Sequence, residues 1–145
     1  ADYPLVLCTV REVGHYSCRS MTGNCAALQT LADEPGFVQI NPHDAEKLGI
    51  RDRQLVWVSS RRGKVISRAD VNERINEGAV YMTYQWWIGA CNELTQDNLD
   101  PVSKTPETKY CAVKINTIAD QSWAENYAQT TYSAMKQRLR EAVES

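Results

Sequence analysis

Short runs of apolar and β-branched residues, separated by polar segments, recur along the first 118 positions of the chain. Runs of this length and composition predict β-strands rather than helices. Strands are expected at residues 3–10, 37–40, 54–60, 65–71, 79–85 and 110–118. The first run, YPLVLCTV, is almost wholly apolar and predicts a buried strand. A polar reversal with a glycine, RRGK at 61–64, predicts a β-hairpin from the third and fourth runs.

A short helix is predicted over residues 41–49. Asn41 is suited to cap its first turn, and Pro42 fits the first helical position because its missing N–H is not needed there. Gly49 is suited to end the helix, since glycine adopts the left-handed conformation without a steric penalty.

A second helix is predicted over about 120–143, where the pattern changes from short runs to helical spacing. Ser122 and Glu125 match a capping box at its start. Its apolar stripe is expected to pack on the strands and to comprise Trp123, Tyr127, Ala134, Leu139 and Ala142.

Together these elements predict a single domain over residues 1–145, mainly β with helices. A mixed β-barrel is expected over about 3–118, followed by the tail helix. The short helix lies between strands and reads as a crossover, which allows some parallel pairing. Residues 11–33 lack periodicity, and a structured connection of that length is usually functional. The chain lacks an initiator Met and enters a strand almost at once, so we expect a fragment of a longer protein.

Composition removes several function classes. The net charge of −2 argues neither for nor against nucleic acid, whereas no apolar run approaches the length of about 18 residues that a membrane span needs. Neither a glycine-rich dinucleotide motif nor a phosphate-binding loop is present. The five cysteines form no C-x-x-C pair and are expected to be free thiols, and no metal site is predicted.

The aromatic residues are unevenly distributed, with four Trp and seven Tyr against a single Phe. Rings with a polar edge would suit a flat binding pocket. Most of them are assigned to ordinary packing, whereas Tyr16, Tyr84, Trp86 and Trp87 lie where strands run into the long connections.

Three segments, taken in their order along the chain, resemble a known family. They are residues 7–17 (LCTVREVGHYS), residues 40–63 with the NPHDA and SSRRG motifs, and residues 92–109 with NELT, DP and PETK. The chain is similar to the molybdopterin-dinucleotide-binding domains, and in detail to the C-terminal domain of molybdenum formate dehydrogenases of the H type. The resemblance covers about residues 3–118.

The resemblance implies a double-psi β-barrel of the aspartate-decarboxylase-like kind. It also implies a cofactor, bis(molybdopterin guanine dinucleotide) carrying Mo or W, in an enzyme that oxidises formate to CO₂. Catalytic residues and iron–sulfur ligands are expected only in upstream domains, so the isolated fragment should be inactive. The implied partners are those domains and an electron-transfer subunit, without nucleic acid or direct membrane insertion. The implied setting is cytoplasmic and anaerobic.

The resemblance also implies a set of cofactor-binding residues. They are Thr9, Arg11, Glu12, His15, Ser17, Tyr84, Asn92 and Lys109. Hydroxyl and cationic groups in this set suit a pyrophosphate, whereas the amide and the carboxylate suit the edges of guanine or pterin. His15 is expected to donate toward a pterin or a dithiolene sulfur, and Tyr84 offers a ring face and a hydroxyl. Thr108 departs from the family, where a large aromatic is frequent beside the lysine.

Other functions remain open at this stage. One is the equivalent domain of another molybdopterin oxidoreductase, such as a nitrate reductase. Another is a double-psi barrel that binds a substrate or adaptor without a dinucleotide, and a third is a small hydrolase using Cys18 with His15. The basic residues Arg51, Arg53, Arg61, Arg62, Lys64 and Arg68 are expected to be a solvated hairpin, with a basic face for nucleic acid, a partner protein or a neighbouring domain as the alternative.

Overall fold

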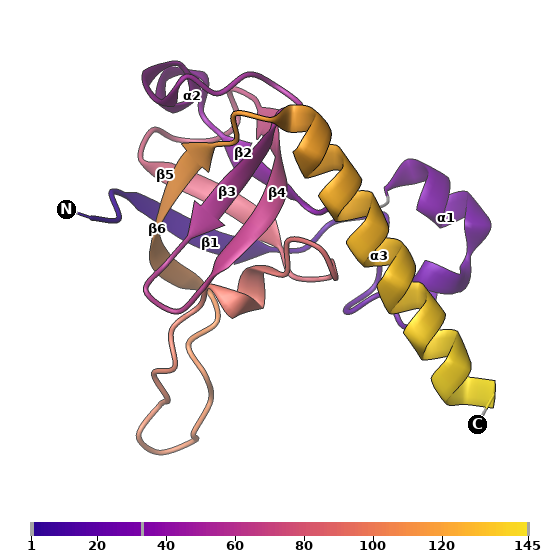
Figure 1. Cartoon of the computed structure of the whole chain (residues 1–145). Coiled ribbons are helices and arrows are strands. Elements are labelled where there is room, and N and C mark those ends of the chain that lie inside the picture. Colours follow the sequence, from indigo (N-terminus) through magenta and orange to yellow (C-terminus); the bar gives the residue numbers. More distant parts are fainter. Residues whose placement is uncertain (1, 33, 145) are drawn as a thin grey trace.

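The computed structural model describes residues 2–32 and 34–144, and within them six strands close into a barrel (Figure 1). The strands are β1 (Leu5–Val10), β2 (Phe37–Ile40), β3 (Leu55–Ser59), β4 (Lys64–Val71), β5 (Ala79–Thr83) and β6 (Tyr110–Thr117). Their order around the barrel is β1-β5-β2-β4-β3-β6. The predicted mixed barrel with a C-terminal helix is confirmed.

Parallel and antiparallel pairs alternate irregularly around this barrel. β1 pairs with β5, and β2 with β4, in parallel, while the other four pairings are antiparallel. Interleaved parallel pairs are what the expected double-psi barrel requires. Because β1 and β5 are parallel, their carboxyl ends meet at one end of the barrel. β6 runs antiparallel to β1, so its first residue lies near that same end.

The barrel interior is filled by the alternate positions that the strand pattern predicts. Leu7, Val38, Ile40, Val56 and Val113 are completely buried. Burying a side chain of this size contributes about 1.5–3 kcal/mol, so these positions dominate the stability of the barrel.

The helices lie outside the barrel wall. They are α1 (Ala26–Leu31), α2 (Pro42–Leu48) and α3 (Gln121–Glu144), with 3₁₀ turns η1 (Thr22–Asn24) and η2 (Cys91–Glu93). α2 has the predicted ends: the Asn41 side chain accepts a hydrogen bond from the His43 N–H at 2.8 Å, and Gly49 ends the helix with φ +66°. η1 and α1 were not predicted, because they bury no residue and so leave no periodic pattern.

Two details of the tail helix were predicted wrongly. The Asp120 carboxylate, not Ser122, accepts the hydrogen bond from the Trp123 N–H at 2.9 Å, and Ser122 lies inside α3. Glu125 is used elsewhere, because it receives two hydrogen bonds from Arg68 at 2.7 and 2.9 Å. The capping box is therefore absent.

The predicted apolar stripe of α3 is also wrong. Trp123, Tyr127 and Leu139 are exposed, at 45%, 41% and 51%, as are Ala134 and Ala142. Instead, Ala124, Ala128 and Tyr132 are buried against the barrel. Small alanines allow the helix to approach the strands closely, whereas the larger Trp123 ring packs at the edge beside Trp57.

Candidate functional site

Several predicted cofactor residues meet at one end of the barrel, which we call the β1/β5 end. Val10 pairs with Thr83 at the carboxyl ends of the two parallel strands. Arg11 and Tyr84 are the next residues along the chain, so both leave the barrel at this end. The Thr9 N–H donates to the Lys109 carbonyl at 2.9 Å, which brings the segment before β6 to the same place. Arg11 and Lys109 are exposed, so two cations are available there.

Thr9 is more deeply placed than its neighbours. Its side chain is buried, with 7% of the residue exposed, and its hydroxyl donates to the Thr108 carbonyl at 2.8 Å. The hydroxyl therefore helps to hold the 108–109 segment against β1, and its contact with a cofactor stays a prediction.

Two buried polar atoms at the β1/β5 end have no hydrogen-bond partner among the described residues. They are Oε2 of Glu12 and Nε2 of Gln85. Gln85 is only 3% exposed, and each residue lies two positions beyond the last pair of β1 and β5. A buried acceptor and a buried donor without partners are costly unless a ligand satisfies them.

The pKa of Glu12 is shifted by the same burial. Burial raises the pKa of the Glu12 carboxyl above its ordinary value, and the nearby charges of His15 and Arg19 offset part of the rise. A partner that donates a hydrogen bond to the carboxylate would lower this pKa again. Sequence reasoning predicted Glu12 through the family resemblance but missed Gln85, which carries no motif.

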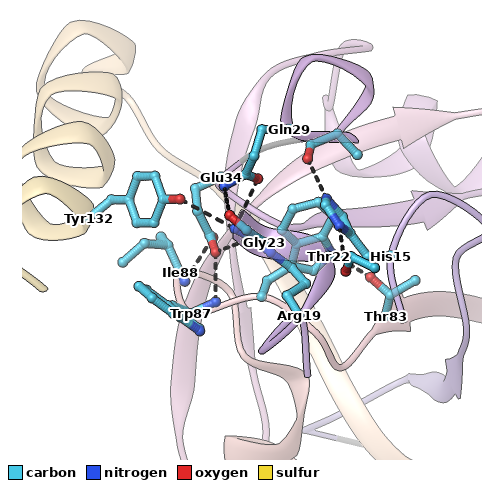
Figure 2. A network of polar contacts seen from close by, with 12 residues as sticks. His15, Arg19, Thr22, Gly23, Gln29, Glu34, Thr83, Trp87, Ile88 and Tyr132 are labelled. Atoms are coloured by element: carbon cyan, nitrogen blue, oxygen red, sulfur yellow. Dashed lines mark hydrogen bonds and ion pairs between the residues drawn. The ribbon is translucent and has the colours of Figure 1, made fainter. Parts of the chain in front are cut away.

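His15 is a buried residue whose ring is fully used within the chain. Nδ1 lies 3.1 Å from the Thr22 hydroxyl oxygen, and Nε2 lies 2.7 Å from the Ala32 carbonyl oxygen (Figure 2). The ring also meets Trp86 edge-on, with centroids 5.8 Å apart. His15 thus fixes the fold of the 11–33 segment, and its contact with a cofactor stays a prediction.

The remaining two predicted residues are exposed. Ser17 has φ +48°, in the left-handed region, where the 11–33 segment turns back. Asn92 lies in η2, beside the β3–β4 turn: a Cβ added to Gly63 would stand 2.9 Å from the Glu93 carbonyl oxygen. No interaction among the described residues joins Asn92 to Arg11 or Lys109, so the structure places it at a separate element.

Sequence reasoning missed an ion pair between Arg19 and Glu34, which Figure 2 shows together with His15. Arg19 Nη1 lies 2.8 Å from Glu34 Oε1, and both side chains are only 2% exposed. Arg19 also donates to Gln29 Oε1 and to the Tyr132 hydroxyl, each at 3.3 Å. Its guanidinium stands 4.9 Å from the ring centre of Trp86.

Glu34 connects this ion pair to the segment after β5. Its Oε1 accepts a hydrogen bond from the Trp87 N–H at 2.8 Å, and its Oε2 accepts one from the Ile88 N–H at 2.9 Å. The pair therefore holds together the 11–33 segment, the 84–88 segment and, through Tyr132, helix α3. We call Arg19, Glu34 and Tyr132 the clamp. Both segments that it joins carry predicted cofactor residues.

A groove of about 660 Å³ lies between the clamp and the second half of α3. Arg19, Trp87, Tyr132, Lys136 and Leu139 are among its lining residues. None of the eight predicted cofactor residues lines it. This groove is therefore not formed by the predicted residues.

The chain has five cysteines, at positions 8, 18, 25, 91 and 111. All five are free thiols, as predicted, and no group of His, Cys, Asp and Glu there is arranged to hold a metal ion. Hydrogen bonds, chiefly from the Ser20 backbone, lower the pKa of exposed Cys18. Both ring nitrogens of His15 already have partners, which counts against a Cys18–His15 hydrolase.

No helix in the described part of the chain is long and apolar enough to cross a membrane. The acetylene hydratase of Pelobacter acetylenicus has a similar fold, with a TM-score of 0.68 and 17% identity over 80% of this chain and 18% of that one.

The chain is also similar to curated proteins. It is 67% identical to formate dehydrogenase H of Escherichia coli K12 over 142 residues, which are 98% of this chain and 20% of that protein. It is 45% identical over 117 residues to the F420-dependent formate dehydrogenase 2 subunit alpha of Methanococcus maripaludis, covering 81% of this chain and 17% of that one. It thus spans about a fifth of the length of these relatives. The family model for the molydopterin dinucleotide binding domain matches residues 5–112, and the chain belongs to that family.

Proposed function

We propose that this chain is the cofactor-binding domain of a formate dehydrogenase and that its β1/β5 end holds bis(molybdopterin guanine dinucleotide). The observation that carries the proposal is the pair of unpartnered buried atoms, Glu12 Oε2 and Gln85 Nε2. Family membership and 67% identity to formate dehydrogenase H support the same assignment.

The residues at the β1/β5 end fit such a group. Guanine and pterin edges present N–H donors beside ring-nitrogen and carbonyl acceptors, which match a carboxylate next to an amide. Exposed Arg11 and Lys109 supply positive charge for the phosphates, and cation–phosphate hydrogen bonds are about twice as strong as neutral ones. Tyr84 is partly buried against the core, and in this proposal its ring packs against the ligand.

The bound cofactor supplies the two-electron chemistry of formate oxidation through its Mo or W centre. This chain's own residues bind and orient it. Glu12 and Gln85 would orient one heterocycle, and Arg11 and Lys109 would hold the phosphates. The clamp joins the two segments that carry Arg11, Glu12 and Gln85.

The same proposal extends to the whole enzyme. Its catalytic residues and iron–sulfur cluster would lie outside this chain, in domains upstream of it. An electron-transfer subunit would be a partner, in keeping with a relative that is named subunit alpha. We place the enzyme in the cytoplasm and in anaerobic metabolism.

A substitution of Gln85 tests the proposal, because two explanations of its unpartnered amide predict opposite outcomes. In the intact enzyme, Gln85→Leu should lower the retention of cofactor at least tenfold, measured as molybdenum and guanine nucleotide bound per protein after dialysis. In cofactor-free enzyme the same variant should be as stable as the parent or more stable, since it removes a buried, unsatisfied donor. Exposed Gln137→Leu, on α3, is the matched control.

Unchanged retention in Gln85→Leu, together with higher stability, would show that the amide is merely unsatisfied. Lower stability without cofactor would show that Gln85 has a partner within the protein. Either result would remove the observation on which the proposal rests.

A further inference from the structure

One face of the barrel is crossed by neither α2 nor α3 in Figure 1. It is formed by β6 with its neighbours β1 and β3. Along β6 the outward residues alternate with buried ones, so Tyr110, Ala112 and Lys114 are all exposed. The β3–β4 turn borders this face.

Four cations gather there, and we call the hollow between them the basic groove. Lys64 and Lys114 are both register partners of Ser59, one from each neighbouring strand, so they flank it on the same face of the sheet. Arg61 and Arg62 follow in the turn, and all four cations are exposed. The groove has a volume of about 570 Å³, and no acidic residue lines it.

Two other basic side chains are paired with carboxylates. Arg68 is bound to Glu125, and Lys47 lies 3.2 Å from Glu77. Within the described residues, no ion pair joins the four groove cations to a carboxylate. Instead, Lys64 Nζ stands 3.9 Å from the ring centre of Trp57. The four groove cations are therefore available to carboxylates from outside this part of the chain.

A second hollow, of about 340 Å³, adjoins the basic groove and shares Ser60, Arg61 and Arg62 with it. Its other lining includes Leu94 and Ala112, with two exposed apolar groups, Val6 at 48% and Tyr110 at 52%. A cationic groove thus continues into an apolar one. None of the eight predicted cofactor residues lines either hollow.

We propose that the basic groove docks an acidic segment of a partner protein, with carboxylates on its four cations and an apolar side chain in the adjoining hollow. This goes beyond the proposed function, because it uses a different face from the β1/β5 end. Nucleic acid fits less well: the chain has a net charge of −2, and the face of Trp57 that bases would stack on is already taken by Lys64.

The test uses the intact, cofactor-loaded enzyme and a fluorescein-labelled peptide of four Glu-Glu-Leu repeats. Fluorescence anisotropy should show binding that weakens with salt, and the double variant Lys64→Glu with Lys114→Glu should weaken it at least tenfold. The double variant Arg61→Glu with Arg62→Glu, in the β3–β4 turn, should also weaken peptide binding at least tenfold. The control, Arg51→Glu with Arg74→Glu, changes the net charge equally at exposed positions outside the groove and should change affinity less than twofold.

Further measurements distinguish an acidic partner from a nucleic acid and from coverage of the groove by the enzyme's own domains. A Gln-Gln-Leu peptide should bind at least tenfold more weakly than the acidic peptide, and a single-stranded 12-nucleotide DNA should bind more weakly too. Equal loss in the control variant, or tighter binding of the DNA, would overturn the proposal. So would protection of Lys64 and Lys114 from acetylation in the enzyme alone, relative to exposed Lys104, because the enzyme's own domains would then cover the groove. Formate oxidation and cofactor content should be unchanged in the groove variants, and their loss would point to the proposed function instead.

Discussion

Glu34→Gln is the most informative single change in the clamp. The Glu34 carboxylate accepts hydrogen bonds from Arg19 Nη1, from the Trp87 N–H and from the Ile88 N–H, and its side chain is 2% exposed. An amide of the same shape has one oxygen in place of two. Whichever way it turns, its NH₂ group faces one of these donors, and buried Arg19 loses the negative charge of Glu34.

The stability cost of Glu34→Gln is set by the burial of the ion pair. Removing one partner of a buried ion pair costs about 3–5 kcal/mol, because the other charge stays in a medium that solvates it poorly. The half-exposed pair of Arg68 and Glu125, whose side chains are 25% and 51% exposed, provides a contrast within the same molecule. An exposed pair contributes about 0–1 kcal/mol, so Glu125→Gln should be nearly neutral.

Hydrogen exchange of the intact protein, followed by mass spectrometry, measures this cost locally. Opening of the 84–88 segment should become easier by about 3–5 kcal/mol in Glu34→Gln, which accelerates exchange of the Trp87 and Ile88 amides by a factor of about one hundred to a few thousand. Glu125→Gln should leave these two amides protected. If both variants exchanged at the parental rate, the clamp would not hold the segment and our reasoning would fail.

Three further predictions concern other parts of the chain. Iodoacetamide should modify exposed Cys18 first and Cys91 last, because burial raises the pKa of Cys91 to about 12; rapid loss of the Cys91 thiol would contradict this. In cofactor-free protein the pKa of Glu12 is raised, so the protonated carboxyl stabilises the fold below its ordinary pKa, and this stability is lost as the pH rises through the folded-state pKa. Glu12→Gln should therefore raise Tm at pH 7 but not at pH 4. An equal rise in Tm at both pH values would refute this prediction. Ala128→Leu should lower the free energy of unfolding, measured in urea, by about 1–3 kcal/mol, because the larger side chain overpacks against the barrel. Exposed Leu139→Ser should lower it by less than about 0.5 kcal/mol. The reverse order would mean that α3 packs on the barrel through the face that the sequence pattern predicted.

The strands were predictable because their chemistry is local. β6 shows alternating exposed and buried positions, and that period of two is written directly in YCAVKINT. α2 was predictable for the same reason, since Asn41 and Gly49 act on adjacent backbone groups. The buried face of α3 was not, because large aromatic residues outweigh small alanines in any hydrophobic pattern, while close approach to a barrel favours the alanines.

The site was predictable only in part. The family resemblance indicated Arg11, Glu12 and Lys109, and the antiparallel pairing of β1 and β6 brings their segments together. Arg19 and Glu34 were missed, because their contact depends on how the 11–33 segment folds over Trp86 and Trp87. A charged residue in a polar connection looks solvated until the tertiary structure buries it.

Cofactor retention by the double variant Arg11→Ala with Lys109→Ala tests the central claim most directly. If these two cations hold the phosphates at the β1/β5 end, loss of two charge-assisted hydrogen bonds, each contributing about 1.5–3 kcal/mol, should speed cofactor release from the intact enzyme by about a hundredfold or more. The double variant Arg51→Ala with Arg74→Ala, which removes two exposed cations elsewhere, should release molybdenum and guanine nucleotide at the parental rate. Equal retention in both double variants would contradict the assignment of the cofactor to this end of the barrel.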